Sequence, residues 1–116
     1  CNAHTTASEA LWAGVPVLTV PGPTYASRVA ASLVTACGLP DLAASDPDSY
    51  VALAVALAND PTTLSGIKQM LDDQRMSLPL FDTERYARDF EALLQRMFDR
   101  AQAGLPPEHL PAAACL

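Results

Sequence analysis

Basic residues are scarce in this 116-residue sequence, where seven Lys and Arg stand against thirteen Asp and Glu and give a formal net charge of −6. The electrostatic field of a chain with this net charge repels a long polyanion on average, so we do not expect nucleic-acid binding. A small anion can still bind, because a few N–H groups aimed at one point outweigh distant, screened surface charges. The net charge therefore does not exclude a nucleotide ligand.

The sequence also has few cysteines and no long apolar run. Cys1, Cys37 and Cys115 are widely spaced and form no Cys-x-x-Cys or Cys/His pattern, which argues against a zinc site and favours a reducing compartment. The apolar segment at residues 15–20 is far shorter than the roughly 20 residues that cross a bilayer. We therefore expect a soluble, cytoplasmic chain that makes no membrane contact.

A secretion signal is absent as well. The first residues, CNAHTT, contain no basic region followed by an apolar run, and the sequence does not begin with Met. Half of the residues are hydrophobic and 17% are charged, a balance typical of globular chains. We expect a globular piece of a longer protein.

Capping patterns and amphipathic periodicity predict five helices. Asp followed by Pro, at residues 46–47 and 60–61, is typical of an N-cap and the first helical position. Asp82 is a third cap, and it precedes a helix with one apolar stripe that we expect to face a core. The helices are expected to begin at Thr5 or Thr6, at residue 24, and after the caps at residues 46, 60 and 82; the first, second and last end near Gly14, Gly38 and Gly104.

One strand is predicted, at residues 15–20, where β-branched residues are followed by a Pro-Gly-Pro turn. A strand this apolar is typical of a parallel sheet that helices cover on both faces. The fold class is therefore α/β, mostly helical with one or two parallel strands, in the C-terminal portion of a doubly wound domain whose other strands lie upstream. We expect residues 1–104 to belong to this lobe and residues 105–116 to form a Pro- and Ala-rich tail.

The stretch with the most chemical information surrounds His4, Thr5 and Thr6. Small and hydroxylated residues at a helix start leave the first N–H groups open to a phosphate, and the helix dipole adds positive charge there. Glu9, one turn later, is placed to accept hydrogen bonds from ribose hydroxyls. The alternative is a capping box in which Thr6 and Glu9 satisfy their own helix without a ligand.

A second candidate loop covers residues 22–28, with Arg28 as an anion contact, although a turn that leads into a helix needs the same residues. No Ser/His/Asp arrangement, phosphate-binding Walker loop or metal signature is present. The candidate ligand contacts are therefore confined to His4, Thr5, Thr6 and Glu9.

At the HTT stretch the sequence resembles the C-terminal end of the O-linked N-acetylglucosamine (O-GlcNAc) transferase family. The resemblance extends in order over nearly the whole chain. The stretches that carry it are CNAHTT at residues 1–6, LWAG at 11–14, VPG at 20–22, ASRVAAS at 26–32, PLF at 79–81, AG at 103–104 and PEH at 107–109.

The resemblance implies a GT-B glycosyltransferase with two Rossmann-like lobes, the C-terminal lobe holding the donor. It implies transfer of N-acetylglucosamine from UDP-GlcNAc to Ser or Thr of acceptor proteins, with no metal or other cofactor and with upstream tetratricopeptide repeats that recognise the acceptor. It further implies that His4, Thr5 and Thr6 contact the diphosphate and that Glu9, where animal members carry Asp, contacts the ribose. Pro23 replaces a glutamate of the family, so no role of that carboxylate is carried over.

The remaining active-site groups, including a lysine beside the phosphates and the contacts to the base, are expected before Cys1. This chain therefore contributes no catalytic residue of its own, and alone it is not expected to transfer sugar. Two other functions stay open: a protein O-fucosyltransferase of the Spindly type that uses GDP-fucose, and a non-catalytic helical interaction module.

Overall fold

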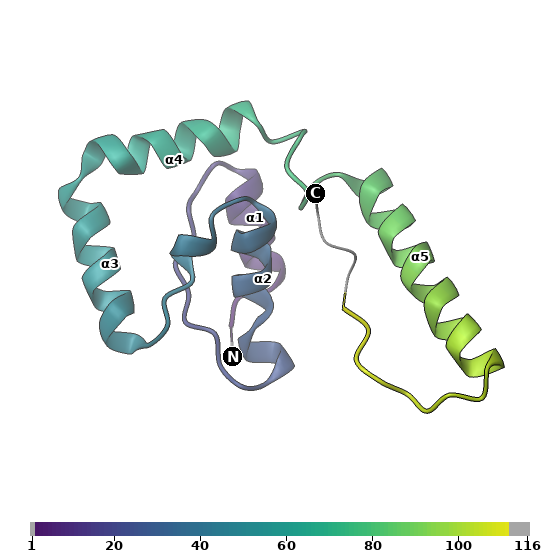
Figure 1. Cartoon of the computed structure of the whole chain (residues 1–116). Coiled ribbons are helices and arrows are strands. Elements are labelled where there is room, and N and C mark those ends of the chain that lie inside the picture. Colours follow the sequence, from purple (N-terminus) through teal and green to yellow (C-terminus); the bar gives the residue numbers. More distant parts are fainter. Residues whose placement is uncertain (1, 112–116) are drawn as a thin grey trace. The chain divides into compact units, whose positions relative to one another are not determined.

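The computed structural model describes residues 2–111, and Figure 1 shows that they are mostly helical. All five predicted helices are present, but the second begins at Val29 and not at residue 24, because Thr24 and Ser27 cap a separate 3-10 helix before it. The α-helices are α1 (Thr5–Trp12), α2 (Val29–Ala36), α3 (Pro47–Asn59), α4 (Pro61–Asp73) and α5 (Thr83–Gln102), and two short 3-10 helices are η1 (Tyr25–Ser27) and η2 (Pro40–Leu42).

The predicted strand at residues 15–20 does not form, so the expected one or two parallel strands are wrong for residues 2–111. The segment makes a single isolated parallel bridge, between Thr19 and Ala43. The Thr19 amide donates to the Leu42 carbonyl at 3.0 Å, and the Ala44 amide donates to the Thr19 carbonyl at 2.8 Å. A strand needs a ladder of such pairs on its neighbours, and one two-bond contact is not a ladder.

Aspartate caps set the starts of the three longest helices, as predicted. Asp46, Asp60 and Asp82 each accept a hydrogen bond from the backbone amide three residues later. Pro at the first helical position of α3 and α4 needs no amide partner, which makes both starts unambiguous. These helix starts could be predicted from the sequence because the Asp caps and the prolines act on residues close to them in the chain.

The chain divides into two compact units, Cys1–Phe81 and Asp82–Leu116. In the first unit α1 packs against α2 and α4, and α3 packs against α4. Their shared apolar core consists of Leu11, Val34, Cys37, Leu42, Leu71 and Leu78. Burial of the Cys37 thiol raises its pKa to about 11, so this thiol stays protonated and contributes packing to the core. The predicted lobe boundary after residue 104 falls within the second unit and stays a prediction.

The second unit consists of α5 and the residues that follow it. Two arginines of α5 hold the tail: Arg96 donates to the Pro111 carbonyl at 2.8 Å, and Arg100 pairs with Glu108 at 2.7 Å. The apolar stripe of α5 was expected to face a core, yet no residue of this helix is buried. Residues 112–116, which complete the predicted tail, lie outside the described residues. None of the described helices has the length and apolarity that crossing a membrane requires.

The cap at Asp46 makes the start of α3 sensitive to acid. The Asp46 carboxylate accepts hydrogen bonds from the Ser49 amide and from the Ser45 and Ser49 hydroxyls, which lower its pKa from 3.8 to about 2. Because the folded pKa lies below the unfolded value, the stabilisation is complete above pH 3.8 and is lost as the pH falls toward 2. We expect the Asp46 carboxyl to titrate near pH 2 by NMR. Asp46→Asn, which still caps but does not titrate, removes this acid sensitivity; a midpoint at 3.8 or above would contradict the expectation.

Candidate functional site

The first turn of α1 presents hydrogen-bond donors that the helix itself does not use. His4 occupies the N-cap position, and no side chain caps this helix. Within residues 2–111, the backbone amides of Thr5 and Thr6 have no acceptor, and both threonines are exposed. No acidic residue lies in this turn. The positive end of the helix dipole is therefore available to an anion.

The capping box that we considered between Thr6 and Glu9 does not form. A capping box joins the N-cap residue to the third helical residue. Because α1 begins at Thr5 with His4 as its N-cap, Thr6 and Glu9 are the second and fifth helical residues and are in the wrong register. The capping box as an explanation for these two side chains is therefore wrong.

The His4 side chain is held against the loop that precedes α2. Its Nε2 atom lies 3.1 Å from the Ala26 carbonyl oxygen, and its ring meets the Tyr25 ring edge-on at a centroid distance of 6.3 Å. A carbonyl oxygen only accepts, so Nε2 donates and Nδ1 is left as the ring nitrogen for another partner.

This loop, residues 22–28, is the second candidate segment from the sequence, and the structure brings it to the start of α1. Thr24 and Ser27 cap η1 reciprocally, with the Thr24 amide donating to Ser27 Oγ at 3.0 Å. The Gly22 amide donates to the Ser27 carbonyl at 3.0 Å and closes the loop. Arg28, the sole Lys or Arg among the first 67 residues, is exposed and lines a hollow of about 340 Å³ with Tyr25, Val29 and Ser32. A cation thus lies on the loop that contacts His4.

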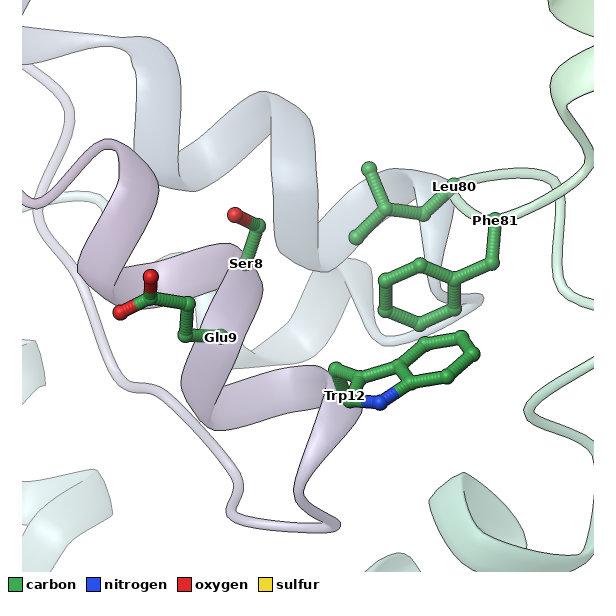
Figure 2. Close-up of a pocket in the computed structure, with 5 residues that line it drawn as sticks. All are labelled: Ser8, Glu9, Trp12, Leu80 and Phe81. Carbon is green, nitrogen blue, oxygen red and sulfur yellow. The ribbon is translucent and has the colours of Figure 1, made fainter.

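Glu9 lies one turn beyond the threonines, at the edge of a second hollow of about 450 Å³ (Figure 2). Ser8, Trp12, Leu80 and Phe81 complete its lining. The Trp12 and Phe81 rings meet edge-on at a centroid distance of 4.9 Å, and the Arg75 guanidinium lies 5.2 Å from the Trp12 ring centroid. In Figure 2 the Glu9 carboxylate points away from the ring pair. Glu9 is therefore directed to solvent, where a polar ligand can reach it.

All four predicted contact residues thus lie at or near the start of one short helix. Sequence reasoning gave no role to Asn2, whose side-chain amide donates to Thr19 Oγ1 at 2.7 Å and to the Ser27 carbonyl at 3.0 Å. Its partners are 17 and 25 residues away, so no local pattern signals them. The nearest sequence signal was the Thr24-x-x-Ser27 spacing, which is typical of a capped turn.

Metal-binding clusters are absent from the described part of the chain: no three His, Cys, Asp or Glu side chains gather in a way that holds an ion. The polar groups at the start of α1 are amides, hydroxyls and an imidazole, and the loop that contacts His4 carries the Arg28 guanidinium. These groups suit a phosphate or a hydroxylated ligand.

Comparison with known proteins gives a consistent family. The family model described as glycosyl transferase family 41 matches residues 1–90. The chain is 40% identical over 110 residues to the UDP-N-acetylglucosamine–peptide N-acetylglucosaminyltransferase of Caenorhabditis elegans. The aligned region covers 95% of this chain and 10% of that protein.

Two plant proteins are also similar. Identity is 37% over 110 residues to the probable UDP-N-acetylglucosamine–peptide N-acetylglucosaminyltransferase SEC of Arabidopsis thaliana, covering 94% of this chain and 11% of the relative. It is 36% over 96 residues to the probable enzyme of the same name, SPINDLY, of Solanum lycopersicum, covering 83% and 10%. The chain therefore spans about a tenth of the length of the curated relatives it matches.

The closeness of Gly22 to Ser27 yields a stability test. A Cβ atom at Gly22 would lie 2.6 Å from Ser27 Oγ and 2.8 Å from Ser27 Cβ. Since Ser27 is fixed by its bonds to Thr24, we expect Gly22→Ala to lower the free energy of unfolding by about 1–3 kcal/mol in denaturant titrations.

Gly66→Ala is the matched control, because Gly66 lies within α4 and a Cβ there meets no atom within 4 Å. Alanine favours a helix over glycine, so this variant is expected to gain about 0.5–1 kcal/mol. Unchanged stability of Gly22→Ala would contradict the rigid loop described here.

Proposed function

The chain belongs to glycosyl transferase family 41, and on that premise we propose that it forms the donor-binding part of a protein O-GlcNAc transferase. The reaction moves N-acetylglucosamine from UDP-GlcNAc to Ser and Thr hydroxyls of acceptor proteins. The observation that carries this proposal is the uncapped first turn of α1, whose Thr5 and Thr6 amides and side chains are exposed beside His4.

In this proposal the start of α1 binds the diphosphate of the donor. Negative charge develops on UDP as it leaves the sugar, and donors that already point at it stabilise that charge without reorganising. The Thr5 and Thr6 amides and hydroxyls serve as these donors, and His4 joins them through Nδ1 when that nitrogen carries a proton, so no metal ion is required. Glu9 accepts hydrogen bonds from the ribose hydroxyls.

The rest of the activity lies in other parts of the longer protein. We propose that this chain completes the C-terminal, Rossmann-like lobe of a GT-B fold, and that the base contacts, the lysine beside the phosphates and the acceptor-binding tetratricopeptide repeats precede it. Thr19 forms a lone parallel bridge with Ala43, which suits a sheet that is completed by strands from elsewhere. The enzyme is expected in the cytoplasm.

The diphosphate role is tested by titrating UDP into the full-length protein and into its Thr5→Ala/Thr6→Ala variant. The variant loses two hydroxyl donors, so we expect its dissociation constant for UDP to rise by about tenfold or more. Thr35→Ala is the control, because this exposed hydroxyl of α2 bonds only to the Ala31 carbonyl at 2.8 Å.

Equal affinities of the wild type and the double variant would remove the Thr5 and Thr6 hydroxyls from the diphosphate contacts. No measurable UDP binding by the wild type would favour the helical interaction module, in which α1 acts only through packing.

The donor is tested separately by competition between UDP-GlcNAc and GDP-fucose in the full-length protein. The Caenorhabditis elegans and SEC relatives carry names that specify UDP-N-acetylglucosamine, and at 40% and 37% identity they are slightly more similar to this chain than the SPINDLY relative at 36%. We therefore expect UDP-GlcNAc to be transferred and GDP-fucose to compete poorly. Transfer of fucose instead would assign the chain to the Spindly-type alternative while leaving the diphosphate contacts in place.

A further inference from the structure

Asn2 joins three segments that are far apart in the sequence. Its Nδ2 atom donates to Thr19 Oγ1 at 2.7 Å and to the Ser27 carbonyl at 3.0 Å, while its Oδ1 atom accepts from the Ala3 amide at 2.9 Å. Its backbone amide donates to the Ala26 carbonyl at 3.1 Å. Asn2 therefore makes contacts in front of α1, in the extended segment at Thr19 and in the loop before α2.

These bonds control how the chain enters α1. The bond from the Ala3 amide to Asn2 Oδ1 fixes the backbone direction one residue before His4. The Asn2 backbone amide and His4 Nε2 both donate to the Ala26 carbonyl. This one oxygen therefore fixes both the path of the chain into α1 and the position of the imidazole. A shift of Asn2 would move His4 and the first helical amides together.

The position of Asn2 distinguishes it from an ordinary core residue. It is half-buried and is not part of the apolar core of the unit. It lines a hollow of about 270 Å³ with Leu18, Thr19, Val20, Ser27 and Tyr50. Two of the groups that Asn2 bonds to, the Ala26 and Ser27 carbonyls, belong to the loop that holds His4.

We infer that Asn2 is a positioning residue for the diphosphate contacts of His4, Thr5 and Thr6, an inference that rests on the proposed function. Asn2 itself does not touch the diphosphate. It holds the start of α1 and the loop at residues 24–27 in one fixed arrangement, so that the donors are aimed before UDP arrives. Misplacement of such donors by about 1 Å is sufficient for large losses in affinity or rate.

The test compares UDP binding by calorimetry in the full-length protein and in three variants. Asn2→Ala removes the side-chain bonds, and Thr19→Val removes one acceptor while keeping the shape of a residue that is 4% exposed. We expect both to raise the dissociation constant of UDP, by about tenfold for Asn2→Ala and less for Thr19→Val. Thr19→Ser keeps the hydroxyl and is expected to bind UDP like the wild type.

Val34→Ala is the control for general destabilisation, because Val34 is fully buried in the core and its apolar side chain neither donates nor accepts a hydrogen bond. We expect it to lower Tm while UDP affinity stays within about twofold of the wild type. If Val34→Ala weakens UDP binding as much as Asn2→Ala at an equal loss of Tm, the positioning role is overturned. If Asn2→Ala does not fold, Thr19→Val against Thr19→Ser decides.

Failure of this inference differs from failure of the proposed function. Wild-type UDP affinity in Asn2→Ala and Thr19→Val, with loss of affinity in Thr5→Ala/Thr6→Ala, would overturn the positioning role and keep the diphosphate site. Wild-type affinity in the double threonine variant as well would overturn the positioning role together with the hydroxyl contacts of the proposed site.

Discussion

The arrangement of the first unit depends on the pairing of one buried polar residue, Thr19. Its backbone amide and carbonyl pair with the segment at residues 42–44, and its hydroxyl accepts from Asn2. A buried polar group without these partners would cost free energy of folding. The chain around Asn2, the segment at Thr19 and residues 42–44 therefore meet at this point. The apolar core, built around Leu11, packs α1, α2 and α4 but has no directional contacts of this kind. The core supplies burial, and Thr19 supplies the direction.

Helix starts were predictable because their causes are local. Asp46, Asp60 and Asp82 cap their helices through amides three residues away, and each cap can be read from the sequence. The strand at residues 15–20 was predicted wrongly because its apolar pattern reports burial and cannot report whether neighbouring strands are present. The stripe of α5 was misjudged for the same reason, since periodicity identifies an apolar face without identifying what covers it.

The four contact residues of the candidate site stay a prediction, whereas the register of α1 excludes the capping box that was the alternative. A helix that begins at Thr5, two residues earlier than the capping box requires, changes Thr6 and Glu9 from a possible internal pair into exposed groups on successive turns. The partners of His4 and Asn2 were out of reach of sequence reasoning, because most are backbone carbonyls at residues 26 and 27 and the Thr19 hydroxyl lies 17 residues from Asn2. Contacts to a backbone leave no side-chain signature.

The Ala26 carbonyl has a consequence for how this segment is able to vary. It accepts one hydrogen bond from the Asn2 amide and another from His4, both at 3.1 Å, so its two lone pairs are fully used. The alanine methyl group contributes nothing to either bond. Residue 26 is therefore free to change its side chain where space allows, while the path of its backbone is fixed. Sequence comparison would score this position by its side chain and overlook it, although the imidazole of His4 is oriented by it.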